Sequence, residues 1–309
     1  MRHIKRYLKI GFVFNLLMTP TYIQATSLNV FACEPEWASL VNELGGSRVN
    51  STSATNAFQD PHHIEARPSL IAKVRNADLV VCSGAELETG WLPMLLKQAA
   101  NHKVLEGKPG YFEAAVQVDR LDMPLHKRQS LDRSLGDIHA SGNPHVHLDP
   151  RRIQTIANAL SERLIHLDTP GQTFYQQRLN AFSQRWQEAT LQWERRTEKL
   201  KNKRVVVHHR DWVYLFDWLK VDIVAALEPK PGLPATAGHL SKLKNLLMQQ
   251  PVHAIIHTPY QNPRFANRLS QLTATPVIEL PYTVGGTEQT QDLFALLDTL
   301  TRKLVDGIK

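Results

Sequence analysis

Short apolar runs alternate with amphipathic stretches along most of this chain. Runs such as "LNVFAC" (28–33), "ADLVVC" (77–82) and "RVVVHH" (204–209) do not alternate with polar residues, which is typical of strands buried on both faces of a parallel sheet. Between them, "EWASLVNELGG" (36–46) repeats apolar residues at helical spacing and ends in glycine. Strand–helix alternation of this kind predicts an α/β fold.

The same patterns give approximate bounds for each element. In the first half they predict strands at 28–33, 48–53, 78–84 and 103–107, and helices at 36–46, 67–77 and 86–100. In the second half they predict strands at 204–209, 222–227, 253–258 and 275–280, and helices at 211–220, 241–250, 262–273 and 290–305.

The middle of the chain has no strand signal. From Pro150 to Lys203 it reads as two long helices, interrupted near Thr169-Pro170-Gly171, and the second is long enough to run between two lobes. We therefore predict two lobes, each a central parallel sheet with flanking helices, joined by a long connecting helix. The predicted divisions are a lobe at 26–150, linking helices at 151–203 and a lobe at 204–309.

The first 25 residues differ from the rest in composition. Basic residues precede an apolar run at 10–23, a pattern that predicts a secretory signal peptide at 1–25 and a periplasmic protein; a short amphipathic helix is the alternative. The 32 Lys and Arg and 29 Asp and Glu of residues 26–309 leave a net charge of +3. No basic block indicates a nucleic-acid partner.

Each of the two cysteines, Cys33 and Cys82, ends an apolar strand-like run. Neighbouring strands lie about 4.8 Å apart, which is within the reach of a disulfide, so a bridge and two buried thiols both fit the pattern. Cys33 also follows "NVFA", which loosely matches a lipoprotein signal, although the run reads better as a first strand.

Three of the fourteen histidines lie in predicted loops at strand ends or before the long helices. They are His62 in "QDPHHIEARPS", His145 in "GNPHVHLDP" and His209 in "RVVVHH". Ligands of open α/β sheets bind where such loops converge, and three imidazoles suit a metal such as zinc. The spacing alone fits three buried histidines bonded to backbone carbonyls equally well.

Five segments carry a family resemblance: "DPHHIEARPS", "NADLVVCSGAELE", "NPHVHLDP", "HRDWVYL" and "LEPKPGLPATAGHL". With the long mid-chain helix, they make the chain resemble the metal-binding proteins of ABC importers that deliver zinc or manganese, the zinc-uptake and TroA-like cluster. The resemblance implies metal ligands at His62, His145 and His209, with His63 beside the site. It also implies a monomer that is not an enzyme, carries Zn²⁺ as cargo and delivers it to a membrane permease.

The chain departs from the family pattern at the fourth ligand. Many members carry an acidic residue after the last strand, but no acid lies between Leu280 and Gly286. Water, His139, His147 or Glu228 remains open for that position, and for His147 we favour packing. An all-imidazole set suits zinc better than manganese, which prefers oxygen. A secreted zinc hydrolase with Glu65 as general base is the alternative function.

Overall fold

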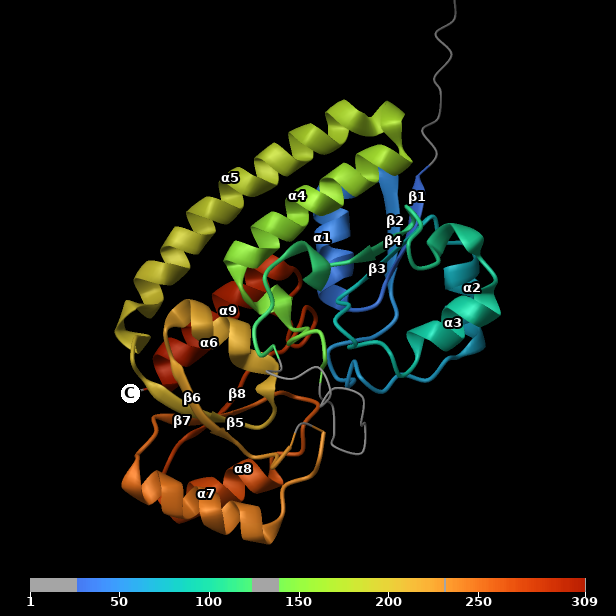
Figure 1. Cartoon of the computed structure of the whole chain (residues 1–309). Helices are drawn as coiled ribbons and strands as arrows, with labels where there is room; N and C mark the ends of the chain where they lie inside the picture. Colours follow the sequence, from blue (N-terminus) through green and yellow to red (C-terminus); the bar gives the residue numbers. More distant parts are fainter. Residues whose placement is uncertain (1–26, 124–138, 231, 309) are drawn as a thin grey trace, which may run out of the picture.

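The computed structural model describes residues 27–123, 139–230 and 232–308, and the predicted signal peptide at 1–25 lies outside them. Two four-stranded parallel sheets form the frame (Figure 1). The first has the order β2-β1-β3-β4, with β1 Leu28–Ala32, β2 Val49–Ser53, β3 Leu79–Cys82 and β4 Tyr111–Glu113. The second has the order β6-β5-β7-β8, with β5 Arg204–Val207, β6 Asp222–Ala226, β7 Ala254–His257 and β8 Val277–Glu279.

Helices cover both faces of each sheet, as the predicted fold class requires (Figure 1). Their bounds are α1 Pro35–Gly45, α2 Pro68–Arg75, α3 Leu92–Ala99, α4 Pro150–Leu167, α5 Gln172–Thr197, α6 Val213–Leu219, α7 Ala237–Gln249, α8 Arg264–Thr273 and α9 Leu293–Gly307. Two buried faces explain why the inner strands β1, β3, β5 and β7 are largely apolar in sequence.

Successive residues of a strand pack against the helices on opposite faces of the sheet. In β1, Val30 packs toward α1 and α4, whereas Phe31 packs toward α2 and α3. In β5, Val205 belongs to the core shared with α6 and α9, whereas Val206 packs against α7 and α8. This alternation follows from the two-residue period of a strand.

The long connecting helix α5 contacts both lobes. At its start Arg178 Nε donates to the Glu43 carbonyl of α1 (2.8 Å), and further along Trp186 packs edge-on against Phe294 of α9. The interruption at Thr169–Gly171 is a short 3₁₀ turn between α4 and α5, as predicted. The lobe limits at 26–150 and 204–309 stay a prediction, and α9 itself reaches the first lobe, where Leu293 N donates to Ser39 Oγ (3.3 Å).

Two predicted elements in the first lobe are wrong. The segment 103–107 is not a strand, because a 3₁₀ turn occupies His102–Val104 and Gly107 has a positive φ of 77°. The fourth strand of the first sheet is β4, at Tyr111–Glu113, and it pairs with β3. The helix predicted at 86–100 begins only at Leu92, since Glu86 has φ 71° and Pro93 suits the first turn of a helix.

Each sheet reverses its strand order beside its first strand, β1 or β5. Ligands of open α/β sheets bind at such a reversal, beyond the carboxyl ends of the strands. His209 directly follows β5, and the His62 loop follows β2. In the described part of the chain, no helix has the length and apolar character needed to cross a membrane.

Candidate metal centre

Four histidine rings from three loops meet where the two lobes face each other. His62 lies in the loop after β2, His139 and His145 lie before α4, and His209 follows β5. Centroids of neighbouring rings lie between 5.3 and 6.4 Å apart. His62, His145 and His209 are buried and His139 is partly exposed. The fold thus brings together the three predicted ligands and one of the open alternatives for the fourth.

The ligand atoms of the site form two overlapping groups, His62 with His139 and His145, and His145 with His209 and Asp211. His62 Nε2 and His139 Nε2 are 3.3 Å apart, and one nitrogen each of His62, His139 and His145 lies within 4.8 Å of the others. Zinc–nitrogen bonds of about 2.0–2.1 Å place the nitrogens of a tetrahedral site about 3.4 Å apart. The buried His145 Nε2 has no hydrogen-bond partner among the described residues. The geometry therefore suits one small cation.

A carboxylate also faces this centre. Asp211 is fully buried, and its Oδ1 lies 3.6 Å from His145 Nε2 and 3.9 Å from His209 Nε2. Tyr260 OH and Gln261 Nε2 hold the carboxylate in place at 3.3 and 3.0 Å. The predicted all-imidazole set is therefore incomplete, because the centre offers an oxygen ligand as well.

Comparison with known proteins places the chain in a family. A family model described as "Zinc-uptake complex component A periplasmic" matches residues 30–307. The chain belongs to this family. It is 21% identical over 250 residues to the high-affinity zinc uptake system protein ZnuA of Bacillus subtilis, which covers 81% of this chain and 76% of that protein.

Other relatives are named for manganese. The manganese ABC transporter substrate-binding lipoprotein of Streptococcus gordonii is 26% identical over 158 residues, which cover 51% of this chain and 47% of that protein. The chain thus spans about half the length of the first curated relatives that it matches.

Solved structures share the fold. A crystal structure of ZnuA has a TM-score of 0.76 at 18% identity, covering 92% of this chain and all of that one. A manganese-bound periplasmic metal-binding protein from Candidatus Liberibacter asiaticus has a TM-score of 0.73 at 16% identity, covering 91% of this chain and 99% of that one.

In this member of the zinc-uptake family, three site rings are oriented through Nδ1. His62 Nδ1 lies 2.8 Å from Asp60 Oδ1, His209 Nδ1 lies 2.7 Å from Glu228 Oε2, and His145 Nδ1 lies 2.6 Å from Tyr282 OH. Partners of this kind fix the tautomer and the ring orientation of a metal-ligating histidine. With Nδ1 engaged, each Nε2 points to the centre.

The loops themselves are tied to the lobes. Asp60 Oδ1 also accepts from the His62 backbone N–H (3.0 Å), and the Pro61 carbonyl accepts from Trp91 Nε1 (2.9 Å). In the second loop, Asn143 Oδ1 accepts from the His145 N–H (3.1 Å) and Asn143 Nδ2 donates to the Arg210 carbonyl (2.9 Å). Asn143 thus connects two ligand-bearing loops.

Burial and neighbouring charges spread the pKa values of the imidazoles apart. Burial, with His62 and His209 nearby, lowers the pKa of His139 to about 3, and the same causes lower the pKa of His145 well below its usual value. Burial also acts to lower the pKa of His209, but Asp211 and Glu228 outweigh it and raise that pKa to about 9. At neutral pH two rings are ready as ligands, and His209 must release a proton to bind a cation.

The remaining sequence candidates take other positions. His147 is fully buried beside the centre, with Nδ1 3.2 Å from Glu36 Oε1 and Nε2 3.1 Å from the Tyr282 carbonyl, so it packs and does not face the other rings. Glu228 stands behind His209 as its hydrogen-bond partner. His63 is exposed, and its ring centroid lies 6.2 Å from that of His62.

Two contributors to the site were missed from the sequence. Asp211 lies two residues after His209, and the 3₁₀ turn at Arg210–Trp212 brings its carboxylate to 3.9 Å from His209 Nε2. Tyr282 lies in the segment in which an acid was sought and contacts His145 instead. No local spacing relates Tyr282 to the histidines.

A polar cavity of about 280 Å³ leads to the centre. Its walls come from both lobes and comprise Phe58, Asp60, His62, His208, His209, Glu228, Gly232, Tyr260 and Gln261. The volume lies at the low end of small-molecule sites, which suits an ion with part of its water.

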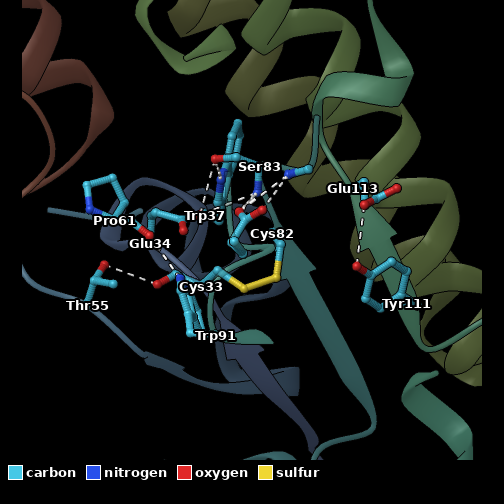
Figure 2. Close-up of a disulfide and its surroundings, with 12 residues drawn as sticks. Cys33, Glu34, Trp37, Thr55, Pro61, Cys82, Ser83, Trp91, Tyr111 and Glu113 are labelled. Atoms are coloured by element: carbon cyan, nitrogen blue, oxygen red, sulfur yellow. Dashed lines mark hydrogen bonds between the residues drawn. A yellow bond between two sulfur atoms is a disulfide. The ribbon is translucent and has the colours of Figure 1, made fainter. Parts of the chain in front are cut away.

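Cys33 and Cys82 form a disulfide with a Cα–Cα distance of 4.8 Å (Figure 2). The bridge joins the ends of β1 and β3, where the strand order of the first sheet reverses. Thr55 Oγ1, at the start of the His62 loop, donates to the Cys33 carbonyl (3.1 Å). The choice left open by the sequence is thereby settled in favour of the bridge, and the buried Cys33 is not available for a lipid.

Proposed function

We propose that the chain binds Zn²⁺ with high affinity in the periplasm and delivers it to the membrane permease of an ABC importer. The observation that carries the proposal is the set of buried, pre-oriented Nε2 atoms of His62, His145 and His209, joined by His139. Imidazole nitrogen is a preferred zinc ligand, and four-coordination is usual for this ion. Membership of a family named for zinc uptake supports the same reading.

Manganese is the second candidate for the cargo. Asp211 supplies the oxygen ligand that manganese prefers, and several relatives are named for manganese transport. The nitrogen-rich set favours zinc, because a single carboxylate among four imidazoles leaves the site short of hard ligands. Copper also binds nitrogen tightly and is a useful competitor in a titration.

The architecture supports capture and delivery better than catalysis. The ligands come from both lobes, so a bound ion would hold the lobes together, while α5 packs on both and limits their movement. Release would then require rearrangement of the ligand loops when the protein docks on its permease. Glu65, the candidate base of a hydrolase, is exposed and does not line the cavity. We therefore propose a binding protein that acts as a monomer without turnover.

Metal content and competition titration test the proposal directly. Protein purified without chelator or added metal should contain zinc, and His62→Ala, His145→Ala or His209→Ala should each weaken zinc binding at least tenfold, because each removes a ligand. His63→Ala is the matched control and should bind nearly as the wild type does. Equal losses in His62→Ala and His63→Ala would contradict the ligand assignment.

A variant of Asp211 tests which of the two metals the site prefers. Asp211→Asn keeps the size of the side chain and removes its charge, so it should weaken manganese more than zinc if the imidazoles dominate zinc binding. An equal loss for both metals would argue against the nitrogen-based preference. The zinc and manganese constants should be measured by competition against the same chelator.

Growth tests the role in the cell. Loss of the protein should impair growth under zinc chelation, with rescue by added zinc, and a variant without His62, His145 and His209 should fail to complement although it is exported. Full complementation by that triple variant would overturn the importer proposal. Zinc-dependent hydrolysis of peptides or esters by the wild type would support the hydrolase alternative instead.

A further inference from the structure

The outer layer of the second lobe carries positively charged side chains and no negatively charged ones. From residue 229 to residue 278 the chain contains five Lys and Arg residues and no Asp or Glu. The five cations are Lys230, Lys242, Lys244, Arg264 and Arg268, and within the described parts of the chain none of them forms an ion pair. Residues 26–309 together carry only +3, so this segment is markedly more basic than the chain as a whole.

Four of these cations lie on two neighbouring helices, Lys242 and Lys244 on α7 and Arg264 and Arg268 on α8, whereas Lys230 lies in the loop beside His209. Helices α7 and α8 lie side by side and cover the same face of the second sheet (Figure 1). Leu240, Leu243 and Leu269 turn inward to the core, whereas Lys242, Arg264 and Arg268 are exposed. The layer therefore presents a basic outer surface, which we call the α7–α8 face.

A groove between the two helices adds an apolar floor to this face. It has a volume of about 530 Å³ and is lined by Ala237, Leu240, Arg264, Phe265, Asn267, Arg268 and Gln271. Arg264 and Arg268 are four residues apart, so their guanidinium groups project from the same side of α8. Met248, near the end of α7, is 68% exposed. Cations above an apolar floor match a phospholipid, whose phosphate lies above its glycerol and acyl carbons.

We propose that the α7–α8 face binds the surface of a bilayer that contains anionic phospholipids. Lys and Arg side chains near such a surface are attracted to its anionic headgroups, and salt screens this attraction over a Debye length of about 8–10 Å. The contact is weak and reversible, and it would restrict diffusion of the protein to the membrane plane. This inference goes beyond the metal function and does not depend on which ion is carried.

Vesicle sedimentation tests the proposal. Wild-type protein, kept in chelator so that no metal bridges it to lipid, is mixed with vesicles of one part phosphatidylglycerol to two parts phosphatidylcholine. We expect binding at low salt, none to pure phosphatidylcholine, and loss at about 1 M salt, where the Debye length is about 3 Å. The double variant Arg264→Glu/Arg268→Glu should bind the mixed vesicles at least tenfold more weakly.

The matched control is Lys73→Glu/Lys97→Glu. It makes the same change in net charge on exposed positions of α2 and α3, the outer layer of the first lobe. It should keep vesicle binding within about twofold, and both variants should keep the rise in melting temperature with zinc. Equal loss in the two variants would attribute binding to net charge and overturn the proposal.

Two other outcomes would also overturn it. One is binding to pure phosphatidylcholine as strong as to the mixed vesicles. The other is evidence that the α7–α8 face contacts a protein partner and not lipid. In that case the wild type would bind no vesicles, and Arg264→Glu/Arg268→Glu would bind zinc normally but fail to support growth under chelation. Failure of the zinc proposal itself would appear separately, as normal vesicle binding by a protein that zinc does not stabilise.

Discussion

At the scale of single residues, the two adjacent histidines of the first loop differ in burial, because His62 is buried and His63 is exposed. Asp60 accepts from both the backbone N–H and Nδ1 of His62, which turns that ring inward, while His63 is exposed. The sequence could indicate His62 only through the family resemblance. The chain alone could not place His139 beside His62, because 77 positions separate them in the sequence and no local spacing relates them.

Buried acids near the site form a second residue-scale feature. The Ser83 backbone N–H approaches both Glu88 Oε1 (2.7 Å) and Glu34 Oε2 (3.3 Å), so the two carboxyl groups converge on one donor. Burial, and then the charges of Glu88 and Glu36, raise the pKa of Glu34 well above its usual value. Burial likewise raises the pKa of Glu88 to about 7, against the backbone N–H groups that lower it. We infer that the pair shares a proton at neutral pH.

This pair predicts how stability depends on pH. When folding raises the pKa of a carboxyl group, the group's contribution to stability is fully present at pH values below its pKa in the unfolded chain, about 4.5. That contribution is lost as the pH rises through its pKa in the folded protein. This pair should therefore contribute a fall in the free energy of unfolding between pH 5 and pH 8, which the comparison of wild type and variant isolates. Glu34→Gln cannot ionise, so it should flatten that fall and be more stable than the wild type at pH 8, as measured by urea unfolding.

Exposed Glu162 provides the control for this prediction. Glu162→Gln removes one carboxylate from the surface of α4 and should keep the wild-type slope of stability against pH. If Glu34→Gln showed the same slope as the wild type, the shared proton would have to be assigned elsewhere. Burial acts to raise the pKa of Asp60, but its hydrogen bonds and attraction to His62 lower that pKa to about 2. Asp60 therefore changes the free energy of unfolding only in more acidic solution.

At the scale of elements, strands buried on both faces were predictable and short edge elements were not. The runs at β1, β3 and β5 are largely apolar, with Asn29 and Arg204 as polar exceptions near the strand starts, because helices cover both sides of them. The three-residue β4 is a strand only through its pairing with β3, and its sequence "YFE" gives no local signal stronger than the nearby "KVLEG". Pairing of this kind is a property of the tertiary structure.

The disulfide between β1 and β3 yields a prediction at this scale. It closes a loop over a sequence separation of 49 residues, and the loop-entropy relation gives a stabilisation of about 4 kcal/mol. Cys33→Ala/Cys82→Ala should lower the free energy of unfolding by roughly this amount in urea. Reducing agent should lower the stability of the wild type similarly and leave the double variant unchanged. A double variant as stable as the oxidised wild type would contradict the role assigned to the bridge.

At the scale of the whole molecule, the site exists only when both lobes are folded and in contact. His62 and His145 come from the first lobe and its junction with α4, and His209 and Asp211 come from the second. The sequence could predict the two lobes and the long helix from periodicity. It could not predict how closely the lobes approach, because that distance follows from the packing of α5 against α1 and α9.

A site shared between lobes should couple metal binding to the stability of the whole protein. A cation that binds only the folded state stabilises it by about 2.7 kcal/mol at a concentration one hundred times its dissociation constant. For a chain of this size we expect zinc to raise the melting temperature by roughly 5 °C or more at neutral pH. The triple variant of His62, His145 and His209 should show no rise.

The same measurement should depend on pH in a defined direction. Burial acts to lower the pKa of His209, but Asp211 and Glu228 outweigh it and hold that pKa at about 9. Below pH 9, zinc must therefore displace a proton from His209. Each further imidazole proton that zinc has to displace weakens binding more. The zinc-induced rise should therefore shrink steadily from pH 8 to pH 5. Thermal unfolding with and without zinc, at constant ionic strength, measures this. A rise that is constant over that range, or larger at pH 5, would mean that the ion binds through carboxylates and not through the imidazoles.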